Sequence, residues 1–221
     1  MTSKRLHLPS LLAGITGTAL LAFTLRTETP ACVISLDKMN ILYCGIDNPA
    51  AILVRGVPEA EVHIQTSENL TLKNERGLWY TLRASAPGEG TITVSGGDLK
   101  PVSFRYRIKR IPDPLLRLGG RHGSRTIGNG EFRAQGGLAA VIEDFDIDAR
   151  CALTSFKMLH LREGRLLAEA TNTGARYDAT VQPIIDSARP GDTYIFQEVK
   201  VRCPGDQAAR ILDETLTFVI R

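Results

Sequence analysis

The chain has 221 residues and a formal net charge of +3, with 43% hydrophobic and 23% charged residues. This composition is typical of a globular protein and excludes a disordered one, because disordered chains are poor in core-forming residues. The length suffices for one large or two small domains. The small positive charge argues against a nucleic-acid-binding protein, which would gather basic residues on one face or along one element.

Residues 1–31 have the pattern of an export signal. Lys4 and Arg5 precede a run from Leu6 to Leu25 that contains no acidic residue, Lys or Arg. A basic start followed by an apolar body directs a chain out of the cytoplasm, so we expect an exported protein. Two outcomes stay open: cleavage as a signal peptide, and retention as an inner-membrane anchor. Lipidation of Cys32 is the least favoured alternative.

Residues 32–111 have the pattern of a β-sandwich. Short apolar runs alternate with clusters of Gly, Asp, Asn and Pro, which are turn-forming residues. Phe104, Tyr106 and Ile108 alternate with charged residues, as a half-buried strand requires. We predict an immunoglobulin-like sandwich of about seven strands. Trp79 is expected to pack in its core or at its rim.

The segment 111–114, Ile-Pro-Asp-Pro, is the expected domain boundary, because two prolines stiffen the chain and forbid a helix. Residues 112–221 are predicted to be β-rich. A hairpin is expected from 151–161 and 166–171, and one helix over 179–188. The predicted fold is therefore mainly β, with two tandem β-sandwich-like domains after the N-terminal segment.

Four cysteines allow three disulfide pairings in an oxidising compartment. We favour a bridge between Cys151 and Cys203, because both fall on predicted strands of the C-terminal half. The alternative is that some of the cysteines are small buried apolar residues. Since no two cysteines have metal-ligand spacing, no metal site is predicted.

Motifs of catalysis are missing from the sequence. The glycine-rich stretch 119–130 lacks the Gly-Lys-Ser/Thr of a phosphate-binding loop and is predicted to be a flexible surface loop. The acidic stretch 143–148 lacks the glycine of a calcium-binding loop and is interpreted as a charged strand start. The histidines have no ligand spacing, and there is no nucleophile elbow. We predict no catalytic residue and no cofactor.

Charged residues of the second half form the candidate partner surface. Opposite charges there could steer a charged partner, although a solvated loop and an exposed strand face explain each group as well. The candidate residues are Arg117, Arg121, Arg125, Arg133, Asp144, Asp146 and Asp148.

Four ordered blocks of the chain match one protein family. The blocks are Met39 to Tyr43 with Gly45-x-Asp47-Asn48-Pro49 and Gly56-Val57-Pro58; Ile111 to Pro114; Ala134 to Leu138 with Phe145 to Asp148 and Ser155-Phe156; and Gly191-Asp192 with Phe196-x-Glu198-Val199-Lys200. They resemble the C-terminal periplasmic domains of the GldM/PorM family, the motor subunit of Bacteroidetes gliding and type IX secretion. The resemblance runs from about Val33 to Arg221.

The resemblance implies tandem β domains, the first of them immunoglobulin-like, in an elongated homodimer. Family members are anchored in the inner membrane by one N-terminal helix, and their C-terminal domain meets an outer-membrane-associated ring. They also carry a helical bundle and a further β domain before the region matched here. This chain reaches that region within about eight residues of its export segment, so we do not expect it to transmit torque.

The favoured hypothesis is a non-catalytic periplasmic scaffold that docks on another envelope protein through its second domain. The alternative is an adhesion or sensor ectodomain that uses the same two domains. An uncharacterised enzyme is the least favoured reading.

Overall fold

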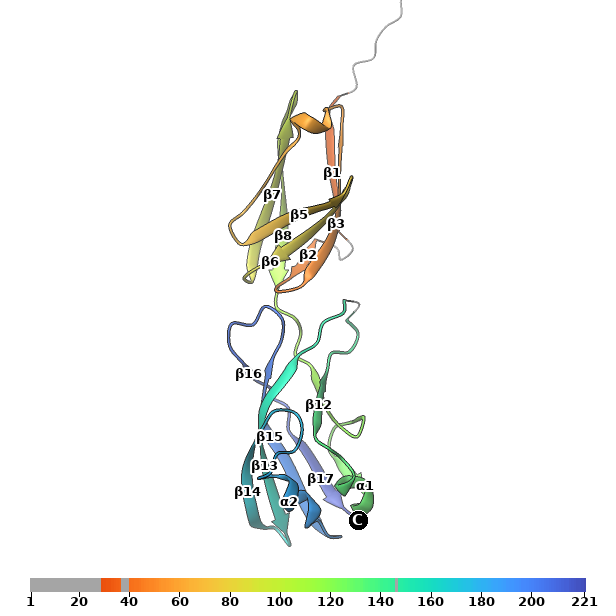
Figure 1. The fold of residues 1–221 in the computed structure, drawn as a ribbon, viewed down its shortest axis with the longest axis vertical. Coiled ribbons are helices and arrows are strands. Elements are labelled where there is room, and N and C mark those ends of the chain that lie inside the picture. Colours follow the sequence, from red (N-terminus) through yellow and green to blue (C-terminus); the bar gives the residue numbers. More distant parts are fainter. Residues whose placement is uncertain (1–28, 37–39, 146) are drawn as a thin grey trace, which may run out of the picture.

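The computed structural model describes residues 29–36, 40–145 and 147–221 (Figure 1). The predicted n-region and apolar run of the export segment, and Asp146 of the candidate surface, lie outside the described residues. Within the described ranges, no helix has the length and apolar character needed to cross a membrane. Two β domains follow one another along the long axis, and the C-terminus lies at the end remote from the first domain (Figure 1).

The first domain is a sandwich of two four-stranded sheets, in the orders β1-β3-β6-β5 and β2-β8-β7-β4. All its neighbouring strands are antiparallel except β2 and β8, which are parallel. The bounds are β1 Ala31–Leu36, β2 Ile41–Tyr43, β3 Asp47–Arg55, β4 His63–Thr66, β5 Leu70–Arg76, β6 Trp79–Ala84, β7 Gly88–Gly96 and β8 Leu99–Lys109, with a 3-10 turn at Glu59–Glu61.

The core of the first domain lies between these sheets. Tyr106 and Ile108 of β8 are buried and Arg107 between them is exposed, as the alternation predicts. Trp79 differs from its prediction, because its side chain is 62% exposed. Leu82 and Ala84 occupy the inward positions of β6, so Trp79 must point to the outer face of the sheet. The expectation that Trp79 packs in the core or rim is wrong.

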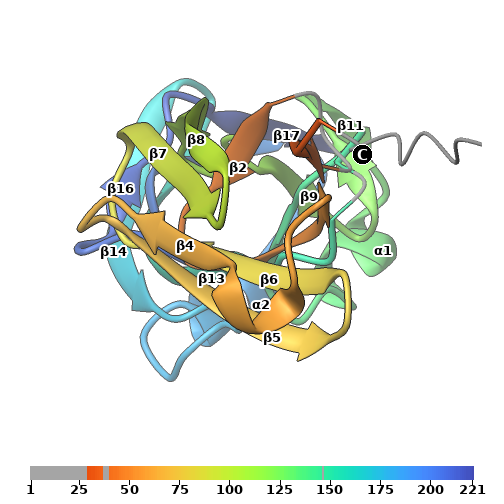
Figure 2. The ribbon, with the colours of Figure 1, turned by 90° about the horizontal axis from the view of Figure 1, so that it is seen from above.

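The second domain contains a small sheet, β10-β9-β12, and a larger one, β11-β17-β15-β13-β14, with β16 paired to β15. Viewed along the long axis, its strands lie beneath those of the first domain (Figure 2). The bounds are β9 Leu115–Leu118, β10 Arg121–His122, β11 Arg125–Ile127, α1 Asn129–Arg133, β12 Leu138–Val141, β13 Ala152–Arg162, β14 Arg165–Thr173, α2 Gln182–Asp186, β15 Asp192–Arg202, β16 Arg210–Ile211 and β17 Leu216–Ile220.

Aromatic side chains fill the core of the second domain. Phe132 of α1 is fully buried and its ring centroid lies 4.5 Å from that of Tyr194 on β15. Phe196 packs edge-on against Phe156 at 5.7 Å and against Phe218 at 6.2 Å. Such aromatic pairs contribute about 0.5–1.5 kcal/mol beyond their buried area. The core therefore ties α1 to the central strands of the larger sheet.

The glycine-rich stretch is more ordered than predicted. It holds β10, β11 and α1 rather than a flexible surface loop, because Ile127 and Phe132 are buried and anchor it to the core. The acidic stretch also differs, since no strand is found in its described residues and Asp144 has a φ of +52°. The prediction of a strand start there is wrong.

Asn48 holds the connection between β2 and β3. Its Oδ1 accepts a hydrogen bond from the backbone N–H of Tyr43 at 2.7 Å. Its Nδ2 lies 3.0 Å from the carbonyl oxygens of Tyr43 and Ile46 and 3.1 Å from that of Leu82. These bonds satisfy backbone groups that the turn would otherwise leave unpaired. The side chain thereby fixes the shape of the residues that face the second domain.

Replacing Asn48 by Ala is expected to lower the free energy of unfolding by about 1–3 kcal/mol, because it leaves buried backbone groups without partners. Urea denaturation followed by circular dichroism measures this loss. The neighbouring Asp47→Ala serves as the control, since the Asp47–Arg83 ion pair is exposed and contributes about 0–1 kcal/mol. Equal stability of the two variants would contradict the role of Asn48.

Candidate functional site

The two domains meet where two glycine backbones come into contact. Gly45, in the connection from β2 to β3, has a φ of +74°, and Gly205, in the turn after β15, has a φ of +79°. A Cβ atom on Gly45 would lie 2.0 Å from the backbone nitrogen of Gly205. A Cβ on Gly205 would lie 2.6 Å from that of Cys44. Both positions therefore require glycine, for the backbone conformation and for the space.

Side chains on either side of Gly45 extend this contact. Ile46 belongs to the first domain in sequence but is buried in the core of the second. Tyr43 packs edge-on against Phe145 with ring centroids 4.8 Å apart. The burial of apolar groups between the domains opposes their separation, at about 25 cal/mol per Å² of apolar surface.

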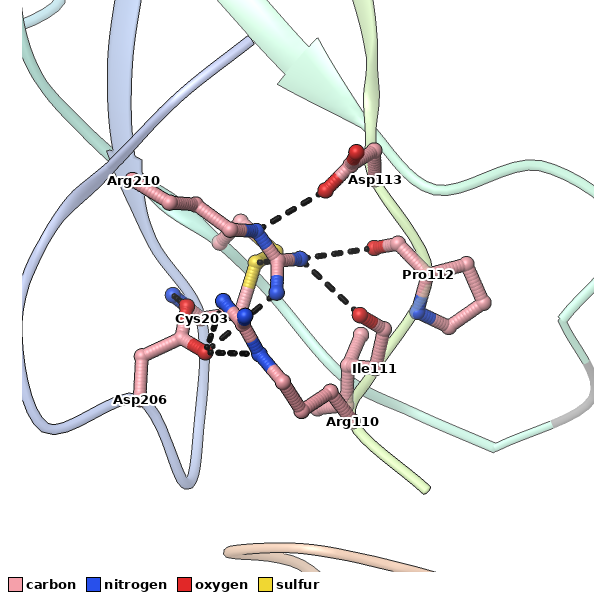
Figure 3. Close-up of a disulfide and its surroundings, with 8 residues drawn as sticks. Arg110, Ile111, Pro112, Asp113, Cys203, Asp206 and Arg210 are labelled. Atoms are coloured by element: carbon pink, nitrogen blue, oxygen red, sulfur yellow. Dashed lines mark hydrogen bonds and ion pairs between the residues drawn. A yellow bond between two sulfur atoms is a disulfide. The ribbon is translucent and has the colours of Figure 1, made fainter. Parts of the chain in front are cut away.

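A charged cluster beside the glycines joins the linker to the second domain (Figure 3). The Asp206 carboxylate is only 2% exposed and accepts hydrogen bonds from Arg110 at 3.1 and 3.2 Å. Arg210 also approaches this carboxylate, at 3.3 Å. The other groups of Arg210 bind the linker: it donates to the carbonyl oxygens of Ile111 and Pro112 at 2.9 and 3.0 Å.

The Arg210 guanidinium also pairs with the Asp113 carboxylate at 2.9 Å. Two arginines and two aspartates thus share one cluster, in which the charges are balanced and the buried carboxylate is paired. An unpaired buried charge is costly, so the cluster favours the arrangement in which all four groups meet. We call the glycine contact and this cluster the domain joint.

A disulfide lies next to the charged cluster. It links Cys151, just before β13, to Cys203, just after β15, and the Cys203 sulfur is 3.3 Å from an Arg210 nitrogen. Cys32 and Cys44 are free. Burial raises the pKa of the Cys44 thiol, which disfavours the reactive thiolate. The joint positions one domain on the other.

The residues of the predicted charged surface are dispersed. Arg117 on β9 is ion-paired with Glu143, and Arg121 on β10 with Glu131. Arg125 on β11 donates to the carbonyl oxygen of His122.

The remaining candidates of this surface lie on other segments. Arg133 is exposed on α1, and Asp144 is exposed in the segment after β12. Asp148 lies 3.9 Å from Arg150 and is almost fully solvated. Because Arg117 and Arg121 are also neutralised by glutamates, the structure does not gather these groups into one concentrated patch.

A second charged cluster, which sequence reasoning missed, lies at the end of the second domain remote from the joint. Asp192 is fully buried at the start of β15. Arg162 binds its two oxygens at 2.7 and 2.9 Å, and His160 Nε2 lies 3.0 Å from Oδ2. The His160 ring also stacks on Tyr194, with centroids 4.5 Å apart. The Arg162 guanidinium is the main cause that lowers the Asp192 pKa to about 2.

This cluster arises only from strand register. Arg162 lies opposite Asp192, and His160 opposite Tyr194, in the antiparallel pair β13–β15. No local motif predicts such a pairing, although Gly191-Asp192 belongs to one of the blocks that carry the family resemblance. Within the part of the chain that the structure describes, no group of three or more His, Cys, Asp or Glu could hold a metal ion.

These features define a protein of two tandem β-sandwich-like domains joined end to end. Residues 31–109 match the GldM third domain and residues 112–221 the GldM C-terminal domain. The chain belongs to the GldM family, whose members are motor components of gliding and type IX secretion. The resemblance drawn from the four blocks is confirmed.

Solved structures similar to this chain are remote in sequence. The ZirS C-terminal domain is 19% identical, with 49% of this chain and 87% of that chain covered and a TM-score of 0.27. Fibronectin(III)-like modules of CbhA from Clostridium thermocellum are 12% identical (86% and 94% covered, TM-score 0.26). The first two immunoglobulin domains of DIP-gamma are 7% identical (88% and 98%, 0.30). No protein of curated function matches the chain.

We predict that Gly45→Ala opens the domain joint, because the new methyl group cannot fit against Gly205. The opened linker should be cut faster by trypsin after Arg110, and gel analysis of timed digests measures the rate. Gly120→Ala is the matched control: Gly120 also has a φ of +74°, but a Cβ there meets nothing within 4 Å. Both variants carry the same backbone strain, of about 1–2 kcal/mol. Equal cleavage of the two variants would show that the contact does not hold the joint.

The Asp192 cluster predicts a pH dependence of stability. The folded-state pKa of Asp192 is about 2, below the usual 3.8, so its contribution is present above about pH 4 and is lost as the pH falls toward 2. The stability difference between the wild type and Asp192→Asn should therefore be on the order of 2 kcal/mol larger near pH 6 than near pH 2. Urea titrations at both pH values measure it. The exposed Asp213→Asn is the control, and a pH-independent difference for Asp192→Asn would refute the assignment.

Proposed function

We propose that the protein is a non-catalytic periplasmic scaffold that docks on another envelope protein through its second domain. The observation that carries this proposal is the pair of GldM matches, which together run from residue 31 to residue 221. Proteins of this family work within a complex of the cell envelope, so a protein partner is expected in general. Components of an outer-membrane-associated ring are the proposed partners.

The geometry of the chain supports docking at the second domain. The described chain enters at the free end of the first domain, and the second domain lies at the opposite end of the long axis (Figure 1). The domain joint holds the two in a defined relation, through the glycine contact and the buried Asp206 carboxylate. The second domain therefore lies at a distance from the end at which the described chain enters the sandwich (Figure 1).

Several further features belong to the same proposal. The division into residues 1–31, 32–111 and 112–221, with the first segment as signal peptide or inner-membrane anchor, is proposed from the sequence. So is a homodimer, from the family resemblance. The seven candidate charged residues are proposed as part of a partner surface, in which Arg125, Arg133 and Asp144 are exposed and have no ion pair described above.

Crosslinking in cells followed by purification tests the proposed function. The wild type and Gly120→Ala should recover the same envelope protein, reproducibly and in similar amount. Gly45→Ala should recover less of it, because the opened joint no longer presents the second domain in one orientation. Repeated purification of the wild type without any envelope partner would overturn the proposal.

A further inference from the structure

Strand β14 forms one edge of the larger sheet in the second domain. β14 is the last strand of the order β11-β17-β15-β13-β14, and it pairs only with β13. Its nine residues contain no Pro or Lys, two residues with which proteins commonly protect an exposed edge, and its charged residues are Arg165 and Glu169. An unblocked edge strand is a template for pairing with another chain.

The hydrogen-bond pattern shows which residues of β14 face outward. Thr173 donates its backbone N–H to Asp178 rather than to β13, whereas Gly174 donates to Thr154. In an antiparallel pair, alternate residues face the partner strand, so the backbone groups of Glu169 and Thr171 point away from β13. No backbone hydrogen bond from these two residues to any described segment beyond β14 is found.

A depression of about 340 Å³ lies beside this edge, between the sheet and α2. Leu167 and Ala168 of β14 contribute to one wall, and Ile184 of α2 contributes to the other. Leu167 and the preceding Leu166 are 53% and 54% exposed, which is unusual for two adjacent leucines. The apolar walls suit an aliphatic or β-branched side chain.

The polar groups that line the depression are basic or neutral. His160, Arg162 and Arg189 are among them, and none of the described lining residues is acidic. Asp192 below them is fully buried and already binds Arg162, His160 and the backbone N–H of Arg189. The Arg189 side chain is exposed and has no ion pair with a described residue. Arg189 can therefore receive a carboxylate that comes from outside, beside Arg162, which already pairs with Asp192.

We propose that β14 binds an extended peptide segment of a partner protein, which pairs with the backbone of Glu169 and Thr171 and places one acidic side chain against Arg189 and Arg162. This inference rests on the proposed function, and it names the chemistry of the partner. Alternate side chains of the added strand point to the face that carries Ala168, where the depression opens. The backbone pairing supplies affinity, and the basic depression supplies specificity for an acidic residue.

The test uses a library of random linear peptides displayed for binding to the purified full chain. The selected peptides should carry one Asp or Glu among β-branched residues. The affinity of the best peptide should fall about tenfold or more with Arg189→Glu and when its acidic residue is replaced by the amide. Arg105→Glu, at an exposed arginine on β8 of the first domain, is the matched control and should change the affinity less than about twofold.

Two further measurements test the pairing with the strand edge. Thr171→Pro removes an outward backbone N–H without removing a hydrogen bond to β13. The variant should therefore lower the affinity for the peptide while the fold persists. If that variant is unstable, N-methylation of the peptide at alternate positions replaces it, since this blocks the same bonds from the other side. Bound peptide should also slow hydrogen exchange at the Glu169 and Thr171 amides.

The outcomes separate this inference from the proposed function. Selected peptides without an acidic preference, or equal binding by Arg189→Glu and Arg105→Glu, would overturn the inference. Edge-to-edge dimers that dissociate in Thr171→Pro and exclude the peptide would overturn it too, because the edge would then serve a second copy. Recovery of an envelope partner by crosslinking in any of these cases would leave the proposed function standing with a different docking surface.

Discussion

The arrangement of this protein depends on the close approach of two backbones, at Gly45 and Gly205. Neither position has room for a Cβ atom, and both need a backbone conformation that other residues adopt only with strain. The contact brings Ile46 into the core of the second domain. It also places Arg110 within reach of Asp206. Apolar burial and the charged cluster therefore act on a geometry that the glycines permit.

The two domains contribute different parts of the structure to the joint and to the remote end. The first domain supplies a sandwich whose β2–β3 connection, held by Asn48, forms its side of the contact. The second domain supplies the turn at Gly205, and it carries the basic depression and the open edge of β14 at its remote part. A partner bound there would be held at a defined distance and orientation from the first domain.

Much of the strand architecture could be predicted because it follows from local periodicity. The alternation around Tyr106 predicted β8, and the hairpin of β13 and β14 was predicted nearly to its ends. The order within the glycine-rich stretch was missed, since it comes from the burial of Phe132 against Tyr194, a contact between residues far apart in sequence. Trp79 was misplaced because aromatic character alone does not tell the inner from the outer face of a strand.

The contacts within the candidate sites could not be predicted from the sequence. Arg162 and Asp192 meet only through the register of two strands, and Arg117 is neutralised by Glu143 from another segment.

The most direct test of the domain joint is the measurement of residual dipolar couplings and ¹⁵N relaxation for both domains of the wild-type chain. One common alignment tensor and one tumbling time are predicted. Separate tensors with independent tumbling would contradict the claim that the joint fixes the second domain on the first.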